Sequence, residues 1–216
     1  AESTKPGATE VDAQKETQRL MPALEAVLDR VPEVPVSVDT YRASTARKAL
    51  AAGAHIVNDV WGLQRDPEIA RVASDFGAGL VIMHTNRERD ALDDVIADQR
   101  SYFEQSLDIA TKAGIGRDQI VLDPGFGFGK ETAEMNFELL ARFDELLDLG
   151  FPILVGTSRK RFLGASIGLE PEQRDQATAA TTSLLRSKGA AIFRVHDVAA
   201  NAEALRISDA MLMQLR

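Results

Sequence analysis

Six short apolar runs, rich in β-branched residues and bounded by turn signals, recur along the chain and constrain its fold more than any other feature. Several are continuous Val, Ile and Leu stretches, which is typical of strands buried on both faces. Successive runs begin roughly 20 to 40 residues apart, the length that a right-handed βαβ crossover needs. The runs are Val34–Val38, His55–Val60, Gly79–Met83, Gln119–Leu122, Phe151–Val155 and Ala190–Val195.

Apolar residues at helical spacing lie between these runs, so the chain alternates strand and helix and the fold class is α/β with a parallel sheet. Four such faces are expected. They comprise Leu20, Leu24, Val27 and Leu28; Ile96, Phe103, Leu107 and Ile109; Phe137, Leu140, Phe143, Leu146 and Leu147; and Ala204, Ile207 and Met211.

Polar or glycine-rich residues follow all six runs, and this favours a closed barrel over an open, doubly wound sheet. An open sheet concentrates its site at one switch point, whereas a barrel uses the carboxyl ends of many strands. A (β/α)8 TIM barrel takes about 250 residues, and this chain supplies six strands. We expect a single barrel domain over residues 1–216 that is N-terminally incomplete, lacking the first strand, the first helix and most of the second strand.

On this interpretation residues 1–4 (AEST) are the end of the second strand. Without two of its eight strands the barrel has unpaired sheet edges. If the missing segment is truly absent, and not merely disordered or unrecorded, the 216-residue chain by itself is expected to be inactive or unstable.

The composition narrows the range of partners. The net charge of −8 argues against a nucleic-acid binder, so an anionic substrate needs a local group of cations. No run approaches the length of a membrane span, so no membrane partner is expected. The chain has no cysteine, which excludes disulfides and thiolate chemistry. With no signal peptide visible at the start, we expect a cytoplasmic protein.

Asp39 and Asn58 follow neighbouring strands and have both ordinary and functional interpretations. Asp39 could cap a helix that begins near Thr45. Alternatively, a buried carboxylate at a barrel mouth accepts N–H groups from a planar heterocycle. Asn58 is an ordinary turn residue or, since an amide both donates and accepts, part of the same polar edge.

The sequence DPGFGFGK at 123–130, termed here the glycine-rich loop, is more specific. It is not a phosphate-binding Walker loop, because the spacing and the residue after Lys130 differ. Its glycines allow close approach of backbone to a ligand, and Phe126 or Phe128 could form an apolar wall. The alternative is a glycine-rich barrel corner.

Two cationic segments end the last two strands. Gly156–Arg161 (GTSRKR) is either a solvated turn or a phosphate site with Lys160 pointing inward. Side chains alternate in direction along a strand, so Arg194 and His196 are expected to point to the same side and to bind an anion together. His55 is expected to be structural, and His84 stays undecided. No spacing typical of protein metal ligands occurs, although Mg²⁺ held mainly by substrate phosphates would leave little trace.

Taken together, these motifs resemble the dihydropteroate synthase family, and the resemblance runs through nearly the whole chain. It implies a pterin-binding TIM barrel and a transferase of folate biosynthesis that uses Mg²⁺. That enzyme joins 6-hydroxymethyl-7,8-dihydropterin pyrophosphate to p-aminobenzoate and releases pyrophosphate. The matching segments, in order, are AESTKPGA, SVDT, IVNDV, VIMHT, DPGFGFGK, GTSRK and FRVHD.

The resemblance also assigns site residues. Lys160, Arg194, His196 and Asp123 are the implied catalytic residues. The implied pterin-binding residues are Asp39, Asn58, Asp123, Lys160, Met83, Gly156 and Arg194. Pyrophosphate is held by Arg194, His196 and Thr4, and p-aminobenzoate by Ser158, Phe128, Thr4 and Lys5.

Two departures from the family pattern stand out. The family has Gly before Glu-Ser-Thr and Arg after it, whereas this chain has Ala1 and Lys5. Lysine keeps the charge but lacks the bidentate fork. The Asn that ligates Mg²⁺ belongs to the family's first strand and loop, so no metal ligand is assigned in this chain. A homodimer through C-terminal helices and inhibition by sulfonamides are also implied by the family alone.

The expected mechanism is loss of pyrophosphate followed by attack of the arylamine. Lys160, Arg194 and His196 would then stabilise the leaving group, and Asp123 the cationic pterin. Two alternatives remain open. One is the related methyltetrahydrofolate:corrinoid methyltransferase barrel, which needs no pyrophosphate clamp. The other is a catalytically silent relative that binds pterin without making product.

Overall fold

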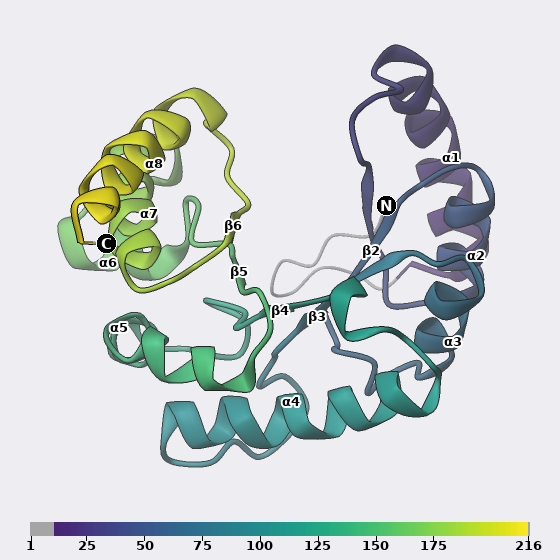
Figure 1. The fold of residues 1–216 in the computed structure, drawn as a ribbon, viewed down its shortest axis with the longest axis horizontal. Helices are drawn as coiled ribbons and strands as arrows, with labels where there is room; N and C mark the ends of the chain where they lie inside the picture. Colours follow the sequence, from purple (N-terminus) through teal and green to yellow (C-terminus); the bar gives the residue numbers. More distant parts are fainter. Residues whose placement is uncertain (1–10, 216) are drawn as a thin grey trace. The chain divides into compact units, whose positions relative to one another are not determined.

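The computed structural model describes residues 11–215 as an α/β chain that divides into two compact units (Figure 1). Of the described residues, the first unit holds 11–83 together with Phe103–Val121. The second holds His84–Tyr102 and residues 122–215. Strand β4 (Ile120–Asp123) and helix α4 (Val95–Lys112) each contribute residues to both units.

The first unit is built on parallel strands. β1 (Ser37–Asp39) pairs with β2 (Ile56–Asp59), which pairs with β3 (Gly79–Met83). Strand β4 begins beside β3 after a short 3₁₀ turn, η1 (Arg117–Gln119). The register places Asp39 opposite Asn58, so the carboxyl ends of β1 and β2 lie level.

Three helices of this unit pack in sequence order. α1 (Ala13–Arg30) contacts α2 (Ala43–Ala51), and α2 contacts α3 (Glu68–Asp75), as Figure 1 shows. Asp12 begins α1 by accepting the Lys15 N–H at 2.8 Å, as N-cap residues do. Helix α2 lies in the segment that connects β1 to β2, and α3 in the segment that connects β2 to β3. Parallel strands require such crossover connections.

The second unit joins β5 (Leu154–Val155) to β6 (Ile192–Phe193) in parallel, and Leu122 bridges to Ile153. An apolar core, which includes Phe126, Leu139 and Phe143, packs beneath these strands. The other elements of the unit are α5 (Ala133–Ala141), η2 (Phe143–Leu149), α6 (Arg161–Ile167), η3 (Pro171–Gln173), α7 (Asp175–Ser187), α8 (Val198–Leu212) and η4 (Met213–Leu215).

Helices α7 and α8 lie side by side and meet through polar residues (Figure 1). Thr182 donates to Asn201 Oδ1 at 2.7 Å, and both residues are buried. The apolar face predicted on α8 points the other way: Ile207 is 74% exposed and Met211 48% exposed. The helix is confirmed, and residues 11–215 leave its apolar side exposed.

All six predicted strands are confirmed, and Gly79–Met83 has the predicted bounds. The predicted helical face from Phe137 to Leu147 is divided, because α5 ends at Ala141 and a 3₁₀ segment takes over at Phe143. Residues 1–4, predicted as the end of a strand, lie outside the described residues. The assignment of 1–216 to a single domain stays a prediction. Among residues 11–215, no helix is long and apolar enough to cross a membrane.

Candidate active site

Asp39 and Asn58 form a pair at the carboxyl ends of β1 and β2. They are register partners, and the Thr40 N–H donates to the Asn58 carbonyl at 3.1 Å. Asp39 is exposed, whereas Asn58 is only 1% exposed. Among the described residues, neither Oδ1 nor Nδ2 of Asn58 has a hydrogen-bond partner. A buried amide of this kind is expected to bind a ligand, because unpaired burial is costly.

Asp39 does not cap the helix that follows it. Helix α2 begins at Ala43, whose N–H donates to Asp66 Oδ2 at 2.8 Å. Thr40 Oγ1 accepts the Arg42 N–H in the turn between them. The helix-cap interpretation of Asp39 is therefore wrong, and its carboxylate is left at the strand end.

Asp123 is a buried carboxylate of the second unit. It ends β4, is 1% exposed, and accepts the Gly125 N–H at 2.8 Å. Arg194 Nη2 lies 3.2 Å from its other oxygen. Burial raises the pKa of Asp123, and the charges of Arg194 and Lys160 oppose that rise. The site therefore contains a buried carboxylate, Asp123, with the guanidinium of Arg194 beside it.

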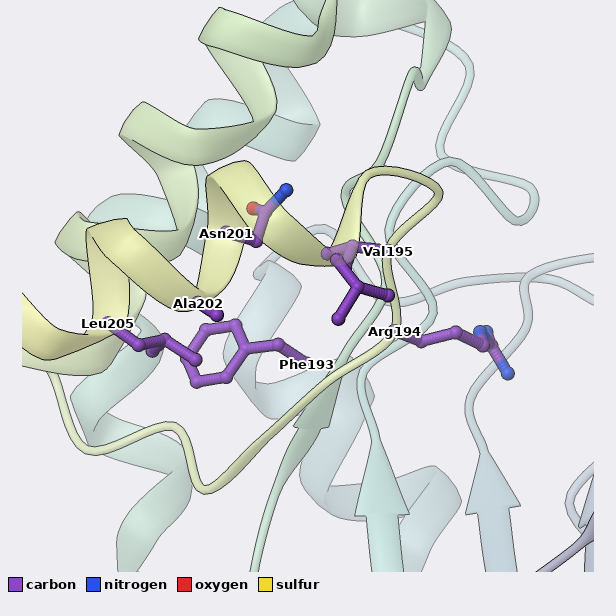
Figure 2. A pocket seen from close by; sticks show the side chains of 7 residues that line it. Phe193, Arg194, Val195, Asn201, Ala202 and Leu205 are labelled. Atoms are coloured by element: carbon purple, nitrogen blue, oxygen red, sulfur yellow. The ribbon is translucent and has the colours of Figure 1, made fainter. Parts of the chain in front are cut away.

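Arg194 comes directly after β6, where side chains alternate in direction. Figure 2 shows the Phe193 ring beside Leu205 of α8, while Arg194 extends away from that helix. A mostly apolar cavity of about 350 Å³ lies on the α8 side. Its lining residues are Phe193, Arg194, Val195, Val198, Asn201, Ala202 and Leu205. This cavity lacks the other predicted site residues.

Lys160 packs its ammonium over the ring of Phe128, 4.1 Å from the centroid. Burial lowers the pKa of Lys160 to about 8, although Asp123 acts in the opposite direction. Gly127 makes this approach possible: its φ is +77°, and a Cβ there would lie 3.3 Å from Lys160 Cδ. The Phe128 ring and the Lys160 ammonium are therefore in contact beside Gly127. Phe126, by contrast, belongs to the apolar core and stacks on Phe162.

Arg159, the neighbouring cation, has a different partner. Its guanidinium donates to both carboxylate oxygens of Asp175, at 2.8 and 2.7 Å. This bidentate pair ties the turn after β5 to the start of α7. Of the three consecutive cations, Lys160 is the one that lies next to the Asp123 carboxylate.

Ser158 and His196 are hydrogen-bonded to each other. Ser158 Oγ lies 2.7 Å from His196 Nδ1 and accepts the His196 backbone N–H at 3.1 Å. The bond joins the loop after β5 to the loop after β6. The predicted p-aminobenzoate and pyrophosphate residues are thus in direct contact in this unit.

The remaining predicted residues are placed as follows. Gly156 is buried, and a Cβ there would lie 3.1 Å from Arg194 Nη2, so the absence of a side chain leaves room for that guanidinium. Met83 is fully buried at the end of β3 in the first unit. Thr4 and Lys5 lie outside the described residues.

His84 belongs to a buried polar group that the sequence pattern does not predict. Its Nε2 lies 2.8 Å from Asp98 Oδ2, and its Nδ1 lies 3.1 Å from Lys130 Nζ. All three residues are buried. The sequence feature that could have indicated this group is Lys130 at the end of the glycine-rich loop, because a lysine that is buried needs a partner. His55 is structural, as predicted, since its Nδ1 accepts the Val36 N–H.

The described residues do not build a metal site of their own. No group of three or more His, Asp or Glu side chains within residues 11–215 could hold a metal ion. The Mg²⁺ implied by the family resemblance therefore stays a prediction.

Comparison with known proteins identifies the class. The family described as pterin binding enzyme matches residues 1–196, so this chain belongs to the pterin-binding enzymes. Within that class its relatives are dihydropteroate synthases. The Bacillus subtilis enzyme is 43% identical over 98% of this chain and 73% of its own length. The Clostridium beijerinckii enzyme is 39% identical over 96% and 77%.

Solved structures agree. A Clostridium difficile dihydropteroate synthase crystallised with pteroic acid has a TM-score of 0.93 and 42% identity, covering 98% of this chain and 80% of that one. A Xanthomonas albilineans enzyme with 4-aminobenzoic acid has a TM-score of 0.92 and 39% identity, covering 98% and 77%. The predicted fold class, an α/β barrel of the TIM type, is confirmed by this likeness.

Proposed function

We propose that this protein condenses 6-hydroxymethyl-7,8-dihydropterin pyrophosphate with p-aminobenzoate to give 7,8-dihydropteroate and pyrophosphate. The observation that carries the proposal is the buried Asp123 carboxylate with Arg194 at 3.2 Å and Lys160 nearby. A buried carboxylate can accept hydrogen bonds from the N–H groups of a flat heterocycle, and adjacent cations can bind its phosphorylated arm. Relatives with pteroic acid and 4-aminobenzoic acid support the same substrates.

The reaction breaks the bond between the pterin CH₂ and the pyrophosphate oxygen, whose electron pair leaves with pyrophosphate. Arg194, Lys160 and His196 stabilise that developing charge. Asp123 stabilises the cationic pterin. The family resemblance further assigns Asn58, Asp39, Met83 and Gly156 to pterin binding.

The arylamine nitrogen of p-aminobenzoate then attacks the CH₂, forming the new C–N bond, and releases a proton to solvent. Ser158 and Phe128 bind p-aminobenzoate. The family resemblance also assigns Thr4 and Lys5 to p-aminobenzoate and Thr4 to pyrophosphate. Ser158 donates to His196 Nδ1, since the serine hydroxyl accepts the His196 N–H and retains one proton to give. No serine or cysteine nucleophile is required.

The proposal extends to the protein's setting. We place it in the cytoplasm and regard it as a homodimer whose contact includes the exposed apolar face of α8, with Ile207 and Met211. Sulfonamides, which imitate p-aminobenzoate, are expected to inhibit it. Mg²⁺ is expected to accompany the pyrophosphate, and the steps above use only side chains of this chain.

The test is release of pyrophosphate by the complete protein with both substrates, compared with each alone. Lys160→Ala should lower kcat/KM for the pterin substrate at least ~10-fold, about 1.4 kcal/mol. Lys112→Ala is the control and should change it less than about twofold, because Lys112 is exposed and pairs with Asp108 on the surface of α4. Pterin binding without pyrophosphate release would indicate a silent relative. Methyl transfer from methyltetrahydrofolate to a corrinoid would indicate the alternative barrel enzyme.

A further inference from the structure

We propose that Lys130, supported by His84 and Asp98, is a positioning residue that holds the glycine-rich loop in place for p-aminobenzoate. This inference rests on the proposed function and extends it to residues that the family resemblance leaves without a role. It is carried by a buried chain of hydrogen bonds that reaches from helix α4 to the loop backbone.

The chain of contacts begins at Asp98 in the first turn of α4. Asp98 Oδ2 lies 2.8 Å from His84 Nε2 and accepts Arg89 Nη2 at 2.6 Å. His84 Nδ1 lies 3.1 Å from Lys130 Nζ, which also donates to the Gly125 carbonyl at 3.0 Å. The His84 N–H donates to the Asp123 carbonyl at 2.8 Å, so the backbone beside the imidazole is held as well.

The partners determine the protonation of each group. His84 donates its Nε2 proton to the Asp98 carboxylate, so Nδ1 is the acceptor for Lys130. Burial and the Lys130 charge lower the pKa of His84 to about 3, which keeps the imidazole neutral. Burial alone would raise the pKa of Asp98, but bonds from His84 and the Leu92 N–H hold it at about 2.

Lys130 itself is 3% exposed, and its ammonium joins the two ends of the loop. Burial lowers its pKa to about 7, against the opposing charges of Asp123 and Asp98. Keeping a lysine in such a place costs free energy. An apolar residue of similar length would avoid that cost but would leave His84 Nδ1 and the Gly125 carbonyl without the bond from Lys130, so the two effects on stability oppose each other.

The loop contacts explain what Lys130 positions. The Phe128 N–H donates to Gly125 O at 3.0 Å, the same carbonyl that Lys130 binds. The Phe128 carbonyl accepts the Asn86 N–H at 3.2 Å. Both backbone groups of Phe128 are therefore held, and its ring is fixed between Lys160 Nζ at 4.1 Å and the Arg87 guanidinium at 4.7 Å. Displacing Gly125 would move this ring, the proposed wall for p-aminobenzoate.

The first experiment separates positioning from folding by steady-state kinetics. Lys130→Met in the complete protein should raise KM for p-aminobenzoate about 10-fold and KM for the pterin substrate less than about threefold. His84→Phe should shift KM in the same direction, because it removes the acceptor for Lys130. Lys112→Met is the control: Lys112 is exposed and pairs with Asp108 on the surface of α4, so both KM values should stay unchanged.

The second experiment does not depend on activity. Hydrogen exchange of the amides of residues 125–130 should become at least ~10-fold faster in Lys130→Met, while exchange in α7 stays as in the wild type. ¹⁵N spectra of the wild type should show His84 protonated on Nε2 and not on Nδ1 at neutral pH. Faster loop exchange in a protein that makes no dihydropteroate would support the positioning role and contradict the proposed function.

Three results would overturn the inference. One is unchanged loop exchange and an unchanged KM for p-aminobenzoate in Lys130→Met. Another is an equal rise in both KM values together with a lower Tm, which is the signature of a merely structural lysine. The third is a His84 imidazole protonated on Nδ1, because it could not accept from Lys130.

Discussion

Asn58 carries a buried amide whose two polar atoms have no hydrogen-bond partner within the described residues. Leaving a polar group in that condition costs about 1–3 kcal/mol. We therefore expect Asn58→Leu to keep or raise the free energy of unfolding, by up to about 1 kcal/mol, while weakening pterin binding at least ~10-fold. Urea unfolding and titration calorimetry measure the two effects separately.

Asn136 supplies the matched control for Asn58. Its amide donates to the carbonyls of Lys130 and Thr132 and accepts the Gly127 N–H, all at 3.0 Å or less. Asn136→Leu should lower the free energy of unfolding by roughly 2–4 kcal/mol, because three backbone groups lose a partner. Equal losses of stability in the two variants would contradict the ligand-binding role of Asn58.

Lys160 gives the site a defined response to pH. Its pKa is lowered to about 8 by burial, so the ammonium loses its proton as the pH rises through 8. Since the proposed role needs the cation, kcat/KM for the pterin substrate should fall as the pH rises above about 8. Lys160→Arg should remove this alkaline decline, because arginine stays charged. An identical decline in that variant would assign it to another group.

The residue types of the site were predictable from the sequence, but their partners were not. Asp123, Lys160 and Arg194 each follow a strand, and parallel strands bring their carboxyl ends to one edge. His84 and Lys130, by contrast, are 46 residues apart, and no periodicity relates them. The same holds for Gln99, whose amide donates to the Pro124 carbonyl from helix α4.

At the scale of elements, the glycine-rich loop lies against the segment that follows β3. Gly129 has φ +68°, and a Cβ there would lie 2.7 Å from backbone and Cβ atoms of Asn86. We expect Gly129→Ala to lower the free energy of unfolding by about 3 kcal/mol, from left-handed strain and from the clash. It should also raise KM for p-aminobenzoate, because Phe128 precedes this glycine.

Gly77 is the control for Gly129, because a substitution there introduces the left-handed backbone strain without a steric clash. Its φ is +62°, yet a Cβ there would meet nothing within 4 Å. Gly77→Ala should therefore cost only the left-handed strain, about 1–2 kcal/mol, with no change in KM. Chemical denaturation of both variants measures the difference, and equal values would mean that the loop moves aside without cost.

Element boundaries show where local patterns stop being sufficient. Strand β1 begins at Ser37, later than the predicted Val34, because Pro35 has no N–H to give to a sheet. Helix α5 ends at Ala141, although the apolar spacing continues to Leu147. At that point Arg142 binds Asp94, Glu138 and Glu145, and the 3₁₀ segment still buries Phe143 and Leu146. The spacing of apolar residues therefore predicts which residues are buried, but it does not distinguish an α-helix from a 3₁₀ helix.

At the scale of the whole molecule, α8 is unusual in burying polar residues and exposing apolar ones. Asn201 and Ser208 face inward, and Asn201 bonds to Thr182 of α7. Ile207 and Met211, one helical turn apart, are exposed. An uncovered apolar stripe on a folded chain usually marks a contact with another molecule. A second copy of this chain is the partner we propose, because two copies would cover the stripe on each other.

Replacing this stripe by charge should therefore separate the copies. We expect the wild-type protein to sediment as a dimer and Ile207→Glu with Met211→Glu to sediment as a monomer at micromolar concentration. The substituted side chains are exposed in the single chain, so each should change the free energy of unfolding of the monomer by about 0.5 kcal/mol or less. Val34→Glu, at an apolar side chain 53% exposed in the first unit, is the control and should leave the dimer intact. A wild-type protein that sediments as a monomer at that concentration would contradict the homodimer.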